Sequence, residues 1–264
     1  MATGNNNATA TFWEHLDELR AVIIRSLVVV VVAAAVAFCL KDVLFHVVLA
    51  PSRADFVTYR LLGAGEFHLH LMNTGLTEQF MIHVRTAMYA GLLAASPYVL
   101  YELFRFVSPA LYDSERRYAV AIVGSAYVMF VVGTLLNYFL VFPLTVRFLG
   151  TYQVSADVDN MLTIQSYIDT LISMSLMLGA VFELPVVCGL LGRMGLVSGR
   201  LMRQYRRHAV VAILIVAAII TPTTDVFTLL VVSLPIWLLY ELSIGIVKLT
   251  GASDTHTANR HPHR

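Results

Sequence analysis

The stretch Trp13-Glu14-His15-Leu16-Asp17-Glu18-Leu19-Arg20, followed directly by the apolar run Ala21–Leu40, decides the class of this chain. About twenty residues rising 1.5 Å each make a helix of roughly 30 Å, which matches the hydrocarbon core of a bilayer. The run therefore predicts a membrane-spanning helix. It is too long, and the segment before it too acidic, for a cleaved signal peptide. Carboxylates at a membrane surface are expected where a cationic partner approaches them.

The composition supports a membrane protein. Hydrophobic residues make up 58% of the 264 residues and charged residues only 13%, against about a quarter charged in soluble domains. The net charge of +1 indicates no general attraction to nucleic acid. Cys39 and Cys188 lie in apolar runs and are interpreted as small hydrophobes, not as a disulfide or metal pair. We expect an all-α polytopic membrane protein without a cofactor or metal site.

Six apolar segments are predicted to cross the membrane. They are Ala21–Leu40, Glu78–Phe104, Tyr118–Phe142, Thr163–Leu191, Ala209–Ile220 and Val226–Leu249. The fifth is only about 18 Å long as a helix, which predicts a thinned bilayer or a water-filled cavity beside it. Residues 1–250 are expected to form a single domain, and the polar tail 251–264 is expected to be disordered.

The distribution of basic residues predicts the orientation, because cytoplasmic loops carry an excess of Lys and Arg. Of the 18 Lys and Arg residues, four fall in segments predicted on the side of the membrane opposite the two termini: Lys41, Arg53, Arg60 and Arg147. Twelve lie on the side of the two termini: Arg20, Arg105, Arg116, Arg117, Arg193, Arg200, Arg203, Arg206, Arg207, Lys248, Arg260 and Arg264. Both termini are therefore predicted to be cytoplasmic, with residues 41–77 as the longest external segment.

No catalytic motif is present. Glu14-His15 lacks the second histidine of a zinc-protease pattern, and Gly195–Gly199 departs from the spacing of a serine-nucleophile loop. A phosphate-binding Gly-Lys-Ser/Thr loop is absent from the sequence as well. We therefore do not expect an enzyme.

Two acidic sites are predicted at the same cytoplasmic surface. Glu14 and Glu18 share one helix face, and Glu115 follows Ser114 at the start of the third span. Each site is also consistent with an ordinary helix start, where the helix dipole favours acids and Ser114 is a possible cap. Together they suggest a receptor of paired carboxylates for guanidinium groups, which bind carboxylates through two parallel hydrogen bonds.

Two further positions are notable inside or beside the later spans. Glu183 precedes Pro185 within an apolar run, and an ionisable residue at membrane depth indicates a functional site by default. A structural hydrogen bond between helices is the alternative. Pro185 is expected to kink the helix. Asp225, which ends the turn Thr221-Pro222-Thr223-Thr224-Asp225, is expected to cap the sixth span.

These motifs together closely resemble the TatC family, the multi-spanning core subunit of the twin-arginine protein translocase. The resemblance covers roughly residues 12–248. It implies a glove-shaped fold with a concave membrane-facing side, located in the inner (cytoplasmic) membrane. It also implies a receptor for signal peptides that exports folded proteins with the proton-motive force. The motifs that carry it are His15-Leu16-x-Glu18-Leu19-Arg20, Ser108-Pro109-Ala110-Leu111-Tyr112-x-x-Glu115-Arg116-Arg117, Phe182-Glu183-x-Pro185 and Thr221-Pro222…Asp225-Val226.

The resemblance also implies roles for individual residues. Glu18 and Glu115 would contact the twin-arginine motif, on a surface shaped by Leu16, Leu19, Arg20, Phe106 and Tyr112. Glu183 and Pro185 would lie in the membrane pocket, and Asp225 in the region where single-span TatA/TatB-type subunits dock. Pro51, Pro109 and Pro222 would be structural. The implied partners are those subunits in an oligomer, twin-arginine signal peptides of folded cargo, and the lipid bilayer.

The sequence departs from the family pattern at a few positions. Val22 stands where a second basic residue is frequent, and Glu102 where Gln or a similar residue is frequent. Thr228-Leu229 replaces a frequent Ser-Gln pair, and Asp17 adds an acid to the N-terminal segment. Two other functions remain as alternatives: a proton-coupled solute transporter with Glu183 as relay, and an intramembrane protease, for which the sequence shows no nucleophile–base or metal set.

Overall fold

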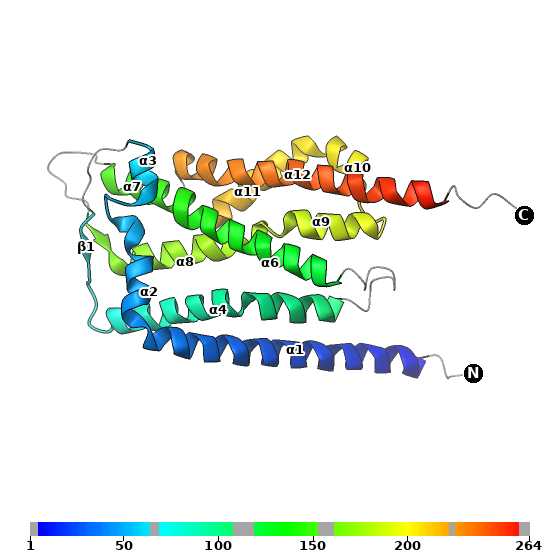
Figure 1. The fold of residues 1–264 in the computed structure, drawn as a ribbon, viewed down its shortest axis with the longest axis horizontal. Helices are drawn as coiled ribbons and strands as arrows, with labels where there is room; N and C mark the ends of the chain where they lie inside the picture. Colours follow the sequence, from blue (N-terminus) through cyan, green and yellow to red (C-terminus); the bar gives the residue numbers. More distant parts are fainter. Residues whose placement is uncertain (1–4, 64–68, 108–118, 153–160, 222–224, 259–264) are drawn as a thin grey trace, which may run out of the picture. The chain divides into compact units, whose positions relative to one another are not determined.

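The computed structural model describes residues 5–63, 69–107, 119–152, 161–221 and 225–258. The chain divides into two compact units, which are described separately. The first unit comprises residues 1–46 and 80–127, and the second comprises residues 47–79 and 128–264. Both are built almost entirely from helices (Figure 1).

The first unit is a pair of long helices with the start of a third. Helix α1 spans Asn5–Cys39 and is followed by the short α2, Lys41–Val48. Helix α4 spans Glu78–Val107, and α6, Ala119–Leu136, begins in this unit. Helices α1 and α4 lie side by side (Figure 1).

The backbones of α1 and α4 touch at Gly91. A Cβ atom at this position would lie 2.5 Å from the Ala34 nitrogen and 2.6 Å from its Cα. Only glycine permits this approach. Close contacts at small residues are typical of helix pairs in membranes, because such helices associate through van der Waals packing and not through the hydrophobic effect. The contact fixes the register in which the two helices present their polar ends.

Proline residues inside the long helices are accommodated by nearby hydroxyl groups. Pro97 in α4 cannot donate to the Leu93 carbonyl, and Ser96 Oγ donates to it instead at 2.7 Å. In the second unit, Pro143 likewise leaves the Phe139 carbonyl free, and the Thr58 hydroxyl donates to that oxygen. Satisfying these carbonyls inside the fold is what allows the helices to continue through apolar surroundings.

The second unit begins with the end of α6, which continues through a π-helical turn. This turn, η3, spans Asn137–Val141, and α7 follows it as Phe142–Thr151. The third apolar segment therefore extends to Thr151 rather than ending at Phe142, because the turn admits Pro143 without breaking the helix. Helices α8, Ile164–Val181, and α9, Leu184–Arg193, come next. Their interruption at 182–183, directly before Pro185, confirms the predicted kink.

The last three helices complete the second unit. They are α10, Gly199–Gln204; α11, Arg206–Ile220; and α12, Val226–Ala258. Asp225 caps α12, since Thr228 N donates to its Oδ1 at 2.7 Å, and this confirms the sequence prediction. Helix α12 continues to Ala258, past the predicted start of the polar tail. Helices α9 and α12 run side by side (Figure 1).

Short elements cover one end of the second unit. They are η1, Ala50–Ser52; α3, Val57–Leu61; and the two-residue strands β1, Leu71–Met72, and β2, Leu162–Thr163, which pair in parallel. Tyr59 is fully buried, and its hydroxyl donates to the Pro51 carbonyl at 2.9 Å and the Pro143 carbonyl at 3.1 Å. These bonds tie the segment around Pro51 to the start of α7. The small strand pair is an exception to the all-α prediction.

Four segments are long and apolar enough to cross a membrane in the described part of the chain. They are His15–Cys39, Ala121–Thr151, Ile164–Arg193 and Val226–Leu249. They correspond to the first, third, fourth and sixth predicted spans. Helices α4 and α11 fall outside this set, so crossing by the second and fifth spans stays a prediction.

Candidate functional site

The first candidate site is the face that α1 turns toward α4, which we name the α1–α4 face. On α1 it carries His15, Glu18 and Arg25, which are spaced by three and then seven residues and so lie along one side of the helix. On α4 it carries Glu102 and Phe106, one turn apart. The His15 and Phe106 rings stack with centroids 4.3 Å apart, and Arg25 Nη1 lies 3.5 Å from Glu102 Oε1. Glu18 is therefore placed between an aromatic stack and an ion pair.

Glu102 is the buried acid of this face, with an exposed fraction of 2%. Its Oε1 accepts a hydrogen bond from the Tyr98 hydroxyl at 3.1 Å and lies 3.8 Å from Arg105 Nη1. Its Oε2 is buried and has no hydrogen-bond partner among the described residues. A buried carboxylate is stable only when positive charges or hydrogen-bond donors compensate it. The guanidinium groups of Arg25 and Arg105 both lie near Oε1, so neither compensates Oε2.

The two arginine side chains are much more exposed than the carboxylate, at 42% for Arg25 and 53% for Arg105. Water screens such pairs, so each contributes about 1 kcal/mol or less to stability. Sequence patterns alone do not predict this cluster. Arg25 and Glu102 were isolated charges in apolar runs, and Glu102 was noted only as a departure from the family pattern.

The structure brings some of the predicted receptor residues together and separates others. Glu18 and Phe106 lie on the α1–α4 face, and Leu19 is half-buried at its border. Arg20 is exposed and lies about 200° around the helix axis from Glu18, on the opposite side of α1. Leu16 is 38% exposed and also lies away from the face. The residues outside the described part of the chain are Pro109, Tyr112, Glu115 and Pro222, as is the side chain of Glu14.

The second candidate site surrounds Glu183 in the second unit. Glu183 joins α8 to α9, is half-buried, and its Oε1 is buried without a hydrogen-bond partner among the described residues. Ser175 and Gly179 precede it at intervals of four, so they lie on the same side of α8. Across from them, Asn137 Nδ2 donates to Ser175 Oγ at 2.8 Å. A Cβ at Gly179 would lie 3.1 Å from the Thr134 hydroxyl.

These side chains form a row of polar groups between two apolar helices, which we name the α6–α8 polar row. Its members are Asn137, Ser175, Thr134 and Glu183. Asn137 Oδ1 and Thr134 Oγ1 are buried and, like Glu183 Oε1, have no partner in the described part of the chain. Buried polar atoms without partners destabilise a fold by about 1–3 kcal/mol each. The row therefore has a free capacity to accept hydrogen bonds from a polar group that reaches it.

For three further predicted residues the structure shows burial or a cap, and the docking roles of Pro185 and Asp225 stay predictions. Pro51 and Pro185 are buried, and Asp225 caps α12. Both cysteines are free. The described residues contain no group of three or more His, Cys, Asp or Glu side chains arranged to hold a metal ion.

Several long apolar helices, a polar face at the end of the first helix pair, and an acid beside a broken helix define a multi-pass α-helical membrane protein. Residues 14–235 match the family described as Sec-independent protein translocase protein (TatC). The chain belongs to the TatC family and is thus a component of a protein translocase that works with other subunits.

Individual relatives agree with this membership. The chain is 33% identical to a TatC of a Blattabacterium species, over 92% of this chain and 96% of the relative. It is 35% identical to the TatC of Koribacter versatilis, over 96% of this chain and 89% of the relative. A crystal structure described as the twin arginine translocase receptor TatC shares 29% identity and superposes with a TM-score of 0.74, covering 89% of this chain and 99% of that one.

Proposed function

We propose that this chain is the receptor for twin-arginine signal peptides and the assembly core of its translocase, which exports folded proteins with the proton-motive force. The observation that supports the receptor role is the α1–α4 face. On α1, Glu18 stands one turn after His15, whose ring stacks on Phe106, and two turns before Arg25, which pairs with the buried Glu102. A carboxylate close to an aromatic ring suits guanidinium groups, which bind acids through two parallel bonds and stack on aromatic rings.

In this proposal Glu18 and Glu115 contact the two arginines of the signal peptide. Each hydrogen bond to a charged group contributes about 1.5–3 kcal/mol. His15 holds the Phe106 ring by stacking at 4.3 Å, which keeps an aromatic surface beside Glu18. Arg20 is exposed on the other side of α1 from Glu18, so no direct contact between Arg20 and the two arginines is proposed.

The test is site-specific photo-crosslinking to a precursor that carries a twin-arginine signal peptide. Photoreactive residues at Glu115 and Phe106 are expected to crosslink to the signal peptide, and one at Arg20 serves as a matched control on the opposite side of α1. Glu18→Lys and Glu115→Lys should abolish the crosslinks while membrane insertion is unchanged. A precursor with two lysines should bind less well, because an ammonium lacks the planar fork. Normal binding by both reversed variants would refute the receptor role.

We further propose that the chain crosses the inner (cytoplasmic) membrane six times. Both termini then lie in the cytoplasm. The twelve-to-four asymmetry of basic residues supports this orientation. With Cys39 and Cys188 removed, single cysteines at Ser155 and Ser253 should react with an impermeant reagent from opposite sides. Reaction of both from outside would contradict the topology.

The α6–α8 polar row is proposed to receive a polar side chain from a single-span TatA/TatB-type subunit, with Glu183 as the main acceptor. Such a bond within a membrane contributes about 0.6–2 kcal/mol. Glu183→Ala should weaken partner crosslinking and cargo transport, whereas Glu183→Gln should be milder because an amide still forms hydrogen bonds. Equal damage by both variants would favour a proton relay, and full transport by both would leave only a structural role.

A further inference from the structure

A pocket of about 390 Å³ lies where two of the candidate spans end. Gly192 lines it from the end of α9, and Val247 and Lys248 line it from α12. The spans Ile164–Arg193 and Val226–Leu249 both finish at this level, so the pocket lies at a membrane surface in either orientation of the chain. Its volume is within the range of small-molecule sites, roughly 300–1,000 Å³.

The walls of the pocket are held by packing and backbone hydrogen bonds. The turn after α9 closes on the Leu191 carbonyl, which accepts from the backbone nitrogens of Leu196 and Val197 at 3.0 and 3.3 Å. Helix α10 is fixed to α12 by Met202, which packs with Val247 in a buried cluster and whose carbonyl accepts from the Tyr240 hydroxyl at 2.7 Å.

Gly199 brings the start of α10 directly against α12. A Cβ there would lie 2.6 Å from Lys248 Cγ, so the lysine stem packs where a side chain would otherwise stand. The pocket is therefore a built feature of the second unit. It is not a gap between loosely placed segments.

The charged lining residues of the pocket are both basic. They are Arg200 and Lys248, and the lining set contains no acid. The nearby Glu241 is engaged by Arg206 at 2.5 Å. Ser198 Oγ accepts from Leu201 N at 3.2 Å, which leaves its hydroxyl proton free to donate.

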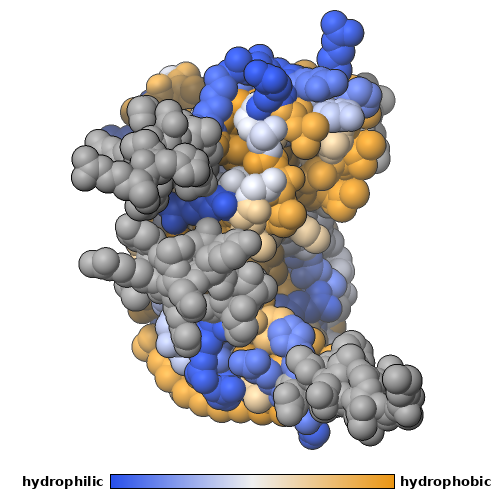
Figure 2. Space-filling view, turned by 90° about the vertical axis from the view of Figure 1, so that its right-hand side faces the viewer, coloured by the Kyte–Doolittle hydropathy of each residue, from blue (hydrophilic) through white to orange (hydrophobic). Residues whose placement is uncertain are grey.

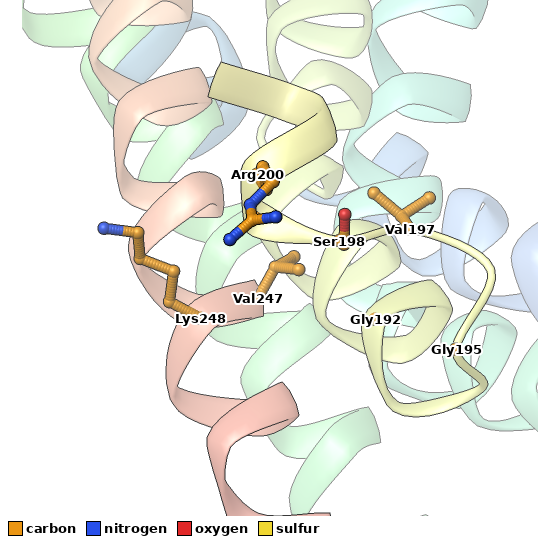
Figure 3. Close-up of a pocket in the computed structure, with 8 residues that line it drawn as sticks. Gly192, Gly195, Val197, Ser198, Arg200, Val247 and Lys248 are labelled. Atoms are coloured by element: carbon orange, nitrogen blue, oxygen red, sulfur yellow. The ribbon is translucent and has the colours of Figure 1, made fainter. Parts of the chain in front are cut away.

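Figure 3 shows the Arg200 side chain between Lys248 and Ser198, above Val247. The Lys248 ammonium extends toward the outer side of α12 in this view, and its flexible four-carbon stem can turn it toward the pocket. Together these groups offer donors and positive charge for an anion.

Exposed apolar side chains flank the same pocket. Leu196, Leu201 and Leu249 are 64%, 44% and 76% exposed. Figure 2 shows hydrophilic side chains gathered at the upper edge of this end of the molecule, directly beside apolar surface. A soluble phosphate would use only the polar part of such a surface. A ligand with an anionic headgroup and apolar chains would use both.

We propose that this pocket binds the phosphodiester headgroup of an anionic phospholipid, with the acyl chains lying along the exposed leucines. Arg200 binds phosphate oxygens through its planar fork, Lys248 adds a second charge, and Ser198 donates a hydrogen bond. Basic pockets between membrane helices bind lipid headgroups of this kind. The proposal does not depend on signal-peptide recognition.

The experiment uses the purified full chain in a neutral detergent and counts bound molecules by native mass spectrometry. The probes are phosphatidylglycerol, phosphatidylcholine and inorganic phosphate. The pocket variant is Arg200→Gln with Lys248→Gln, and the matched control is Arg203→Gln with Arg207→Gln, which removes the same charge from exposed positions outside the pocket lining. A third variant, Arg200→Lys with Lys248→Arg, preserves the charge.

Each basic residue near an anionic lipid is expected to change affinity about fivefold, so the pocket variant should bind phosphatidylglycerol about 25-fold more weakly. The control variant should bind within about threefold of the parent chain, and the charge-preserving variant should fall between the parent and the pocket variant, because it keeps both charges but moves the planar fork away from position 200. Phosphatidylcholine should bind weakly to all four. Equal losses in the pocket and control variants would overturn the proposal, because only general surface charge would then matter. Inorganic phosphate binding as tightly as phosphatidylglycerol would also overturn it.

Discussion

Gly91→Ala is expected to separate the two helices that carry the proposed receptor face. The added Cβ would lie 2.5–2.7 Å from the nitrogen, Cα and Cβ of Ala34, all of which are backbone or directly attached to it. These atoms cannot rotate away. Since non-bonded carbon atoms rest about 3.5–4.0 Å apart, α1 and α4 must move apart by about 1 Å.

The consequences of that shift can be estimated from the face itself. If α1 moves as a rigid body, the 3.5 Å contact between Arg25 and Glu102 lengthens to about 4.5 Å, and the 4.3 Å stack of His15 on Phe106 opens similarly. Overpacking of this kind destabilises by about 1–3 kcal/mol, and the better helix propensity of alanine returns up to about 1 kcal/mol. If about 1 kcal/mol is returned, a net cost of up to about 2 kcal/mol remains, so precursor binding should fall by up to about 30-fold.

The assay combines thermal unfolding of the purified chain with photo-crosslinking of a twin-arginine precursor. Gly124→Ala is the matched control, because nothing lies within 4 Å of a Cβ at that position in α6. It should keep full crosslinking and be slightly more stable. If Gly91→Ala matched Gly124→Ala in both measurements, the close helix contact would not position the face, and the reasoning would fail.

Three further changes test other parts of the structure. Burial raises the pKa of Tyr59 above its ordinary value of about 10, so its stabilising effect is complete below pH 10 and is lost as the pH rises further. Tyr59→Phe should cost about 0.5–1.5 kcal/mol in denaturant titrations at pH 8, and the difference should shrink toward pH 11. Asp225→Ala removes the cap of α12 and should cost about 1 kcal/mol, with Asp225→Asn close to the parent chain. In a double-mutant cycle, Glu102→Gln and Arg25→Gln should show a coupling of about 0.5–1 kcal/mol that salt reduces, and strictly additive effects would contradict a direct ion pair.

The features that were predictable from the sequence depend on local signals. Apolar length identified four of the spans that the structure supports, including Val226–Leu249 with the same bounds. Asp225 directly before an apolar run indicated a cap, and Pro185 indicated a broken helix, because each acts on backbone groups within four residues. The family motifs added Glu18 and Phe106; in the structure Phe106 stacks on His15, one turn before Glu18 on α1, and their receptor roles stay predictions.

The features that were missed depend on contacts between distant segments. The strands β1 and β2 have two residues each, too few to show an alternating pattern, and they form only because they meet across the second unit. The predicted third span ends at Phe142, whereas the helical segment continues past Pro143 to Thr151. The structure instead adds a π-helical turn and a hydroxyl bond from Thr58, which is far away in the sequence.

The pairing of Arg25 with Glu102 shows why single residues in apolar runs are hard to interpret from sequence. Each is an ionisable group in a predicted membrane span, and each alone would indicate a functional site by default. The 3.5 Å contact between Arg25 and Glu102 shows that the two residues form an ion pair, in which each charge compensates the other. Glu102 Oε2 has no hydrogen-bond partner among the described residues, and Glu102 lies on the same α1–α4 face as Glu18. An acid at position 102, where the family pattern frequently has an amide, thus adds negative charge to the proposed receptor face while Arg25 and Arg105 offset it. If the face is the receptor proposed above, the balance between these three charges, together with Glu18, would set how strongly it attracts a guanidinium group.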